Sequence, residues 1–377
     1  MALHGRPRQI PGPTSREARI RFHCCALLVV LAVGGCTHPA PRPVGAPRNG
    51  VYLPAEPGEG HLTNIRQLTF GGNNAEAYFS ADGQRLIFQH KDSVDKNTGC
   101  DQEYVMNIDG SGMRRVSNGR GRTTCGYFIE HDQRIIYSST FADNPACPPV
   151  PDPSLGYVWP LGRFEIYSAR PDGSDLRQLT HTGSYNAETT ASPDGRHLIF
   201  TSTRDGDIDL YTMDVDGQHV KRITSRIGYD GGAFFSSDGR EIVWRASYPA
   251  TAADSADYRR LFAEHLVRPA ALELWTAHAD GSGAHQVTHL GGANWAPYFF
   301  PDGKRIIFAS NYRNPRSGNF DLYQVRTDGT GLEQVTTSTE FDGFPMFSPD
   351  GRKLVWVSSR HSREQGEINL FIADWKD

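Results

Sequence analysis

The sequence lacks the features that mark several large classes of protein. Its 377 residues carry a formal net charge of −4, with no basic run after the N-terminal segment, which argues against a nucleic-acid partner. The Gly-x-Ser-x-Gly elbow of α/β-hydrolases, the His-Glu-x-x-His of zinc proteases and the phosphate-binding P-loop are absent. No hydrolase domain follows the repeats described below. We therefore expect a protein without a catalytic apparatus.

Long hydrophobic runs are also missing, and the N-terminal apolar stretch is too short to span a bilayer. Arg16, Arg19 and Arg21 precede the apolar run 26–33, which ends in Val-Gly-Gly-Cys at Cys36. Small residues before a cysteine resemble the lipobox of bacterial lipoproteins, in which the cysteine is acylated and becomes the new N-terminus. Residues 1–36 are therefore predicted to be a lipoprotein-type signal peptide, with lipidation at Cys36; the alternative is ordinary secretion with cleavage nearby.

Thr37 follows this cysteine, so the aspartate that retains lipoproteins in the inner membrane is absent. We expect a periplasmic protein anchored to the outer membrane. Residues 37–60 are rich in proline and glycine, which is typical of a flexible or polyproline-like tether. The folded part is then residues 61–377.

Cysteine is scarce in the folded part. Cys100, Cys125 and Cys147 remain there, in an oxidising compartment. An odd number predicts one disulfide and one free thiol, and the sequence does not say which two residues pair.

Internal repetition decides the fold. A five-residue motif that begins with phenylalanine or alanine and ends in Asp-Gly occurs five times, and each copy is followed by an apolar strand. The copies are residues 79–83, 191–195, 235–239, 299–303 and 347–351. A degenerate sixth copy, 127–137, aligns without gaps to 78–88, with Asp132 in place of the glycine. Asp-Gly between two apolar runs is a strong hairpin signal, because glycine supplies the positive φ of a tight turn.

A third and a fourth strand follow each hairpin, except that the last unit has no fourth strand after it. The missing copy lies at the front, where residues 65–69 nearly repeat residues 176–180. The N-terminal strand is therefore expected to complete the last blade beside residues 370–373. This arrangement predicts an all-β fold: a six-bladed β-propeller with four-stranded blades, closed by its N-terminal strand.

These repeats resemble the propeller of TolB and its relatives. The resemblance rests on the five turns above, on Asp-Gly-Ser at 109–111, 172–174 and 280–282, and on residues 200–205. It covers about residues 61–377 and is specific for fold but weak for function. TolB carries an α/β domain before its propeller, whereas only the proline-rich tether stands there in this sequence. The chain is therefore expected to be TolB-like without being TolB.

The loops entering each innermost strand, and those joining the second and third strands, share one face, which we call the insertion face. The Asp-Gly turns lie on the opposite, hairpin-turn face. Insertions at 141–162 and 247–270 lie on the insertion face, and residues 252–267 are predicted to be helical, ended by Pro269. We expect these insertions to form a lid over the channel, or to pack on each other for stability alone. The predicted lid residues are Tyr157, Trp159, Tyr229, Tyr258 and Trp295.

Polar residues recur in register where each innermost strand begins. One column contains Asn74, Thr123, Asn186, Asp230, Asn294 and Asp342; two residues on, a second column contains Glu76, Cys125, Glu188, Gly232, Ala296 and Phe344. Convergence on the propeller axis would form a ligand site built from Asn74, Glu76, Asn186, Glu188, Asp230, Asn294 and Asp342. Oxygen ligands of this type suit Ca²⁺, with Glu76, Glu188, Asp230 and Asp342 as its candidate ligands. The same side chains also suit a sugar, a polyol or an amine, which they would bind by hydrogen bonds. Alternatively, they only cap strand ends through local bonds to the backbone.

Two functions from different classes remain. The first is a non-catalytic cell-envelope binding module, expected to be a monomer without a cofactor, whose insertion face binds a protein, peptide or glycan. The alternative is a calcium-dependent propeller hydrolase or lyase with the metal in its central channel. A propeller that scaffolds a larger complex is a third possibility.

Overall fold

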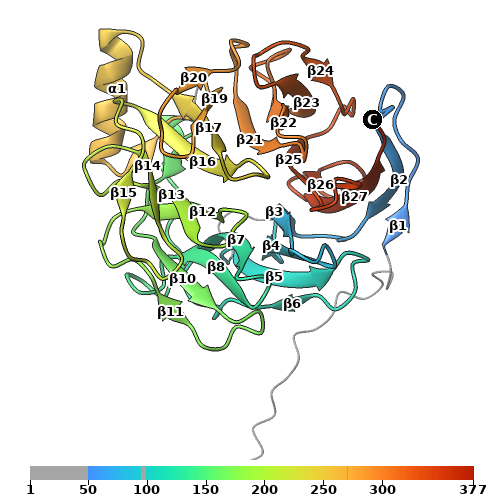
Figure 1. The fold of residues 1–377 in the computed structure, drawn as a ribbon, viewed down its shortest axis with the longest axis horizontal. Coiled ribbons are helices and arrows are strands. Elements are labelled where there is room, and N and C mark those ends of the chain that lie inside the picture. Colours follow the sequence, from blue (N-terminus) through green and yellow to red (C-terminus); the bar gives the residue numbers. More distant parts are fainter. Residues whose placement is uncertain (1–49, 95–98, 270) are drawn as a thin grey trace, which may run out of the picture. The chain divides into compact units, whose positions relative to one another are not determined.

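The computed structural model describes residues 50–94, 99–269 and 271–377. Six antiparallel sheets stand around a central axis, five with four strands and one with five (Figure 1). The predicted signal peptide, Cys36 and the first part of the tether lie outside the described residues. Within the described part, no helix has the length and apolar character needed to cross a bilayer.

The first three blades follow the chain, each from its innermost strand outward. Blade 1 contains β3 (Asn73–Phe79), β4 (Arg85–Lys91), β5 (Gln102–Asn107) and β6 (Arg114–Arg115). Blade 2 contains β7 (Thr123–Ile129), β8 (Arg134–Ser139), β10 (Glu165–Ala169) and β11 (Arg177–Gln178). Blade 3 contains β12 (Asn186–Ala191), β13 (His197–Ser202), β14 (Asp209–Asp214) and β15 (Lys221–Arg222).

The next two blades repeat this order, and the last blade joins both ends of the chain. Blade 4 contains β16 (Tyr229–Phe235), β17 (Glu241–Ser247), β19 (Glu273–His278) and β20 (His285–Gln286). Blade 5 contains β21 (Asn294–Phe299), β22 (Arg305–Ser310), β23 (Asp321–Arg326) and β24 (Glu333–Gln334). Blade 6 contains β25 (Asp342–Phe347), β26 (Lys353–Ser358), β27 (Asn369–Trp375), β2 (Leu62–Gln67) and β1 (Val51–Tyr52).

The predicted ring closure is confirmed. Strand β2 pairs antiparallel with β27, with Arg66 opposite Ile372 and Gln67 opposite Phe371. Figure 1 shows the two strands side by side near the C-terminus. The fold is therefore a six-bladed β-propeller whose last blade contains strands from both ends of the chain.

The hairpin turns have the geometry that their sequences predict. In blade 1, Gly83 has a φ of 66°, and the Ser80 hydroxyl donates to Asp82 Oδ1 at 2.6 Å. In the degenerate copy Asp132 takes the glycine position with a φ of 68°. Its carboxylate accepts the backbone N–H groups of Ala81 and Asp82 at 2.7 and 3.0 Å, so it ties the turns of blades 1 and 2 together.

The segment 50–60, assigned above to the tether, packs on the propeller. Strand β1 adds a fifth strand to blade 6, with Val51 opposite Gln67. The buried Glu59 carboxylate accepts hydrogen bonds from Arg360 at 2.9 and 3.2 Å. A buried charge needs a partner of opposite sign, and Arg360 lies in the last blade, far along the chain.

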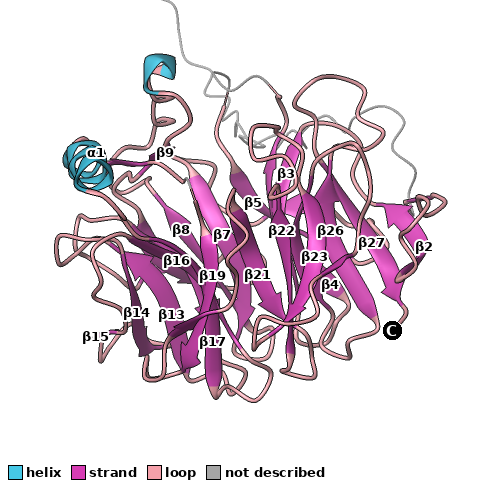
Figure 2. Cartoon of the chain, turned by 90° about the horizontal axis from the view of Figure 1, so that it is seen from above, coloured by secondary structure: helices cyan, strands magenta, loops and turns pink. Residues whose placement is uncertain are grey.

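The predicted helix 252–267 is shorter in the structure. Helix α1 spans Ala252–Ala263 and begins with a capping box formed by Thr251 and Asp254. His265 has a φ of 57°, which turns the chain out of the helix before Pro269 is reached. Residues Leu266–Val267 form strand β18 instead, which pairs with β9 (Trp159–Pro160). Figure 2 shows α1 and β9 at one end of the propeller strands, the insertion face.

Candidate functional site

A β-bulge interrupts every innermost strand, and its residue faces the channel. The six residues of the second column, Glu76, Cys125, Glu188, Gly232, Ala296 and Phe344, have φ values between 49° and 61°. The strand pairing shifts register at this point in all six blades. These residues line a small space on the axis, which we call the axial chamber. Its free volume is about 20 Å³, enough for about one water molecule.

The first column lies elsewhere, between neighbouring blades. Its asparagines and aspartates are fully buried, and they do not line the chamber. Asn186, for example, accepts from Ser202 at 2.8 Å and donates to Glu165 of the preceding blade at 3.2 Å. Asn294 bonds Ser310 and Glu273 in the same way, at 2.6 and 3.0 Å. These bonds join adjacent blades through side chains.

The four candidate calcium ligands are therefore not brought together. Asp230 accepts from Trp244 Nε1 at 2.7 Å and from the Tyr248 hydroxyl at 2.6 Å. Asp342 accepts from Arg360 at 2.9 Å. Only Glu76 and Glu188 of the four line the chamber. Among the described residues, no group of three or more carboxylate, histidine or cysteine side chains is placed to hold a metal ion.

An arginine occupies the place that a cation would take. Arg245, in β17, forms a buried ion pair with Glu188. The same carboxylate accepts from the Thr201 hydroxyl at 2.7 Å and from the backbone N–H of Gly232 at 3.0 Å. Glu188 is thus satisfied by the protein itself. Among the described residues that line the chamber, Arg245 supplies its positive charge.

Sequence reasoning missed Arg245, although a signal was present. The equivalent positions in the other blades, read from the strand pairing, are uncharged: Gln89, Ser138, Thr201, Ala309 and Val357. Two glycines face the ion pair and make room for it. A Cβ on Gly232 would lie 1.9 Å from Arg245 Nη1, and one on Gly231 would lie 2.5 Å from Glu188 Oε2.

Two further carboxyl groups near the chamber resist ionisation. Burial raises the pKa of Glu76 to about 7, and the Glu188 carboxylate adds to the shift. Glu103, on β5, is fully buried, and neither of its carboxyl oxygens has a hydrogen-bond partner among the described residues. Burial holds the pKa of Glu103 well above its usual range, so it is a neutral acid.

The predicted lid residues take several positions over the chamber. The ring centres of Trp159 and Tyr229 lie 5.4 and 5.6 Å from the guanidinium carbon of Arg245 and 5.9 Å from each other. The Tyr258 hydroxyl donates to Asp207 and to the Gly228 carbonyl, which fixes α1 to the propeller. Trp295 packs against Phe344 at the chamber wall, with ring centres 4.5 Å apart. Tyr157 is 72% exposed and accepts from Trp159 Nε1 at 3.0 Å.

The cysteine pairing is resolved. Cys100 and Cys147 form a disulfide, and Cys125 is a buried free thiol in the axial chamber. Burial raises the pKa of Cys125 well above its usual range, so it stays a thiol and is a poor nucleophile.

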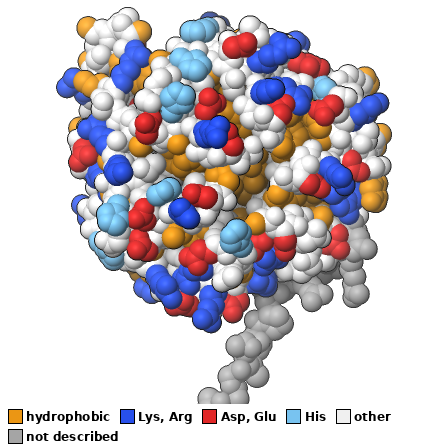
Figure 3. All heavy atoms as spheres, viewed as in Figure 1, with side chains coloured by type: hydrophobic (Ala, Val, Ile, Leu, Met, Phe, Trp, Pro, Cys, Tyr) orange, Lys and Arg blue, Asp and Glu red, His pale blue; other side chains and the backbone are white. Residues whose placement is uncertain are grey.

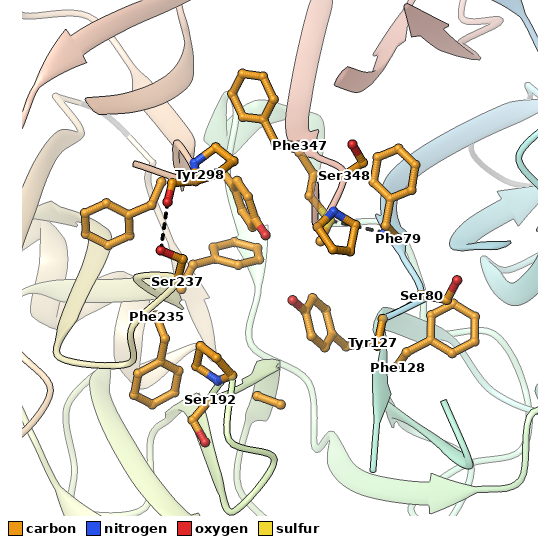
Figure 4. A pocket seen from close by; sticks show the side chains of 18 of the residues that line it. Phe79, Ser80, Tyr127, Phe128, Ser192, Phe235, Ser237, Tyr298, Phe347 and Ser348 are labelled. Atoms are coloured by element: carbon orange, nitrogen blue, oxygen red, sulfur yellow. Dashed lines mark hydrogen bonds between the residues drawn. The ribbon is translucent and has the colours of Figure 1, made fainter. Parts of the chain in front are cut away.

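A much larger cavity opens on the hairpin-turn face, opposite to the lid. We call it the turn-face cavity; it has a volume of about 270 Å³. Ten side chains from the ends of the innermost strands form its apolar wall: Phe79, Tyr127, Phe128, Ala191, Phe234, Phe235, Tyr298, Phe299, Met346 and Phe347. Figure 3, which views this face, shows hydrophobic side chains at its centre inside a rim of charged ones. Figure 4 shows the cavity from close by.

Aromatic rings separate the two spaces along the axis. Tyr78 packs against Tyr127 and Phe234, with ring centres 5.6 and 5.5 Å apart, and Phe234 packs against Tyr298 at 5.2 Å. Phe234 lines both the axial chamber and the turn-face cavity. These rings close the channel at its middle, between the axial chamber and the cavity at the hairpin turns.

The serine hydroxyls at the cavity rim already have partners. Four of them donate to the aspartate of their own turn at 2.6 to 2.7 Å: Ser80, Ser192, Ser236 and Ser348. Hydrogen bonds in the turn lower the pKa of each of these four aspartates, so the carboxylates are weak bases that do not activate the hydroxyls. The rim therefore provides shape and apolar surface.

Comparison with known proteins agrees with this geometry. A family model described as the TolB beta propeller domain matches residues 159–257. A TolB from Agrobacterium tumefaciens superimposes with a TM-score of 0.53 at 17% identity, covering 81% of this chain and 91% of that one. The chain is a TolB-like six-bladed β-propeller.

Two enzymes also show similarity to the chain. Dipeptidyl-peptidase 5 of Porphyromonas endodontalis is 26% identical over 124 residues, or 33% of this chain; the chain spans 15% of that relative's length. A gluconolactonase from Xanthomonas campestris superimposes with a TM-score of 0.58 at 13% identity, covering 87% of this chain and 98% of that one. The second likeness is one of fold alone.

Proposed function

We propose that this chain is a non-catalytic binding protein of the bacterial cell envelope, which holds a protein or peptide partner at the hairpin-turn face of its propeller. The observation that carries the proposal is the turn-face cavity: a 270 Å³ apolar space that is open to solvent. The cavity lies on the face opposite to the one that the insertions led us to expect.

The axial chamber supports binding over catalysis. Its one ion pair is internally satisfied, Trp159 of the lid lies beside the arginine, and the free volume of about 20 Å³ has no room for a substrate. The calcium-dependent hydrolase or lyase hypothesis needs several carboxylates to converge on the axis. Here Asp230 and Asp342 bond to side chains between the blades. Titration calorimetry with Ca²⁺ separates the two hypotheses, since tight binding lost in Glu76→Ala and Glu188→Ala would favour the enzyme.

The envelope location is part of the proposal and rests on the sequence around Cys36. Acylation of this cysteine would hold the propeller at a membrane through the segment 37–49. We expect Cys36→Ser to release the protein from the membrane fraction. Continued partition of the variant with membranes would show that acylation is not the anchor.

A capture experiment with matched variants tests which face binds. The exposed Ser237 lies at the cavity rim, and the 72% exposed Tyr157 lies on the lid. The full chain is used to capture envelope proteins, alongside Ser237→Arg and Tyr157→Arg. The proposal predicts that Ser237→Arg loses the partner and Tyr157→Arg keeps it. The reverse pattern would assign binding to the insertion face.

A further inference from the structure

The turn-face cavity is asymmetric, because blade 3 lacks the aromatic side chains that the other blades place there. The strand pairing identifies two equivalent layers. In the upper layer stand Tyr78, Tyr127, Thr190, Phe234, Tyr298 and Met346. In the lower layer stand Phe79, Phe128, Ala191, Phe235, Phe299 and Phe347. Tyr78 and Thr190 of the upper layer line the axial chamber and not the cavity. In the lower layer, which lines the cavity, blade 3 alone contributes a small residue, Ala191, and the space beside it is a notch in an otherwise aromatic wall.

The size of the cavity limits what it can hold. An apolar cavity of about 150 Å³ is enough for a benzene molecule, whereas sites for drug-sized ligands measure about 300–1,000 Å³. A volume of about 270 Å³ therefore fits one ring system somewhat larger than benzene. The rest of a larger ligand would lie across the rim, where proline and serine residues of the turns are exposed.

The cavity also offers polar groups at its centre. Tyr127 and Tyr298 belong to opposite blades, and their hydroxyl groups point toward each other in Figure 4. Burial raises the pKa of Tyr127 to about 12 and that of Tyr298 well above its usual range. Both phenols keep their protons. Their O–H groups and oxygen lone pairs are therefore available to a ligand in the cavity.

From the notch, the volume and the two phenols, we propose that the turn-face cavity binds a single aromatic side chain of the partner polypeptide, with its ring against Ala191. A ring with a polar edge, tryptophan or tyrosine, fits best, because its N–H or O–H reaches the tyrosine hydroxyls. Such buried aromatic anchors supply much of the binding energy of protein interfaces. This inference rests on the proposed function, since it names the ligand chemistry of the same site.

Small probes test the inference without the partner. N-acetyl-tryptophanamide, N-acetyl-tyrosinamide and N-acetyl-leucinamide are titrated against the purified full chain by ligand-observed NMR. The tryptophan and tyrosine probes are expected to bind saturably and more tightly than the leucine probe. Absence of saturable binding by both aromatic probes would overturn the inference. A partner captured through Ser237 in the experiment above would still stand.

Filling the notch provides the decisive variant. Ala191→Phe restores the residue that the other five blades carry at this position, so the backbone accommodates it. It should weaken binding of the tryptophan probe at least tenfold. Ala256→Phe, the same change at an exposed position of α1, should leave it unchanged. Should Ala191→Phe not fold, Ala191→Leu fills part of the notch and should still weaken binding severalfold. Equal affinity in the folded notch variant and the parent would refute the inference.

Discussion

Removal of Arg360 should destabilise the propeller more than removal of its partner Glu59. The guanidinium is 5% exposed and lies between two carboxylates with fully buried side chains, Glu59 and Asp342, at 2.9 Å from each. Arg360→Met would leave both carboxylates without a counter-charge. Breaking a buried ion pair in this way costs about 3–5 kcal/mol.

Glu59→Gln changes less. Arg360 keeps Asp342, and the amide oxygen still accepts a hydrogen bond. The amide NH2 group cannot accept the second bond from Arg360, so one bond is lost and the other becomes weaker, at a cost of about 2–3 kcal/mol. Arg352→Met is the matched control, because Arg352 is 85% exposed and lies 3.9 Å from Asp350. A surface pair of this kind is worth about 0–1 kcal/mol.

Urea unfolding of the full chain, followed by tryptophan fluorescence at pH 7, measures the three changes. The order Arg360→Met, Glu59→Gln, Arg352→Met should hold from most to least destabilised. The Arg360→Met penalty should shrink at acid pH, where the two freed carboxyl groups are protonated. An Arg360→Met variant as stable as Glu59→Gln would refute the electrostatic account of how the N-terminal segment is held.

Three other changes test separate parts of the structure. Burial raises the pKa of Glu76 to about 7, so the stability that this carboxyl group contributes is present below pH 4.5 and lost as the pH rises through 7. Glu76→Gln should therefore raise the melting temperature by several degrees at pH 8 and leave it unchanged at pH 4.5. Replacing both Cys100 and Cys147 by serine opens a loop with a sequence separation of 47 and should cost about 2–4 kcal/mol in denaturant unfolding, whereas unchanged stability would show that the disulfide constrains little. Asp132→Ala and Asp132→Gly both lose the hydrogen bonds to the blade 1 turn. The φ of 68° at this position strains alanine but not glycine, so the alanine variant should be less stable than the glycine variant by about 1 kcal/mol. Equal stability of the two variants would contradict the assignment of strain.

The fold was predictable because each blade carries its own turn signal. Asp-Gly marks five of the six hairpins, and the displaced strand at the front follows from counting the units. Strand β1 and the Glu59 contact were not predictable. The Glu59 contact depends on Arg360, 301 positions away, and no repeat relates the two residues. The helix prediction ran too far because His265 leaves the helical conformation without a glycine or proline to mark the place.

The site was predictable only in part. A regular strand puts residues i and i+2 on one face, so both polar columns were expected to face the axis. The bulge in each innermost strand breaks this alternation. Glu76 and Glu188 therefore face the channel, while Asn74 and Asn186 stay between the blades. Bulges leave no clear mark in a single sequence.

The turn-face cavity did leave a mark in the repeat. Ala191 stands where the other five copies have phenylalanine, and the aligned motifs show this directly. Its meaning depends on the absence of a compensating larger residue from another blade, which only the structure reveals. The ion pair of Arg245 was predictable to the same extent. The aligned repeats show that Arg245 is the one charged residue at its position, but they do not show that its partner is Glu188 of blade 3.

Site-specific cross-linking in living cells tests the central claim most directly. A photo-reactive amino acid is placed at Ser237 on the cavity rim, at Tyr157 on the lid, or at Leu176, which is 39% exposed in the outer part of blade 2. The account predicts a discrete cross-linked partner from position 237 and none from 157 or 176. A partner captured from position 157 and not from 237 would contradict it.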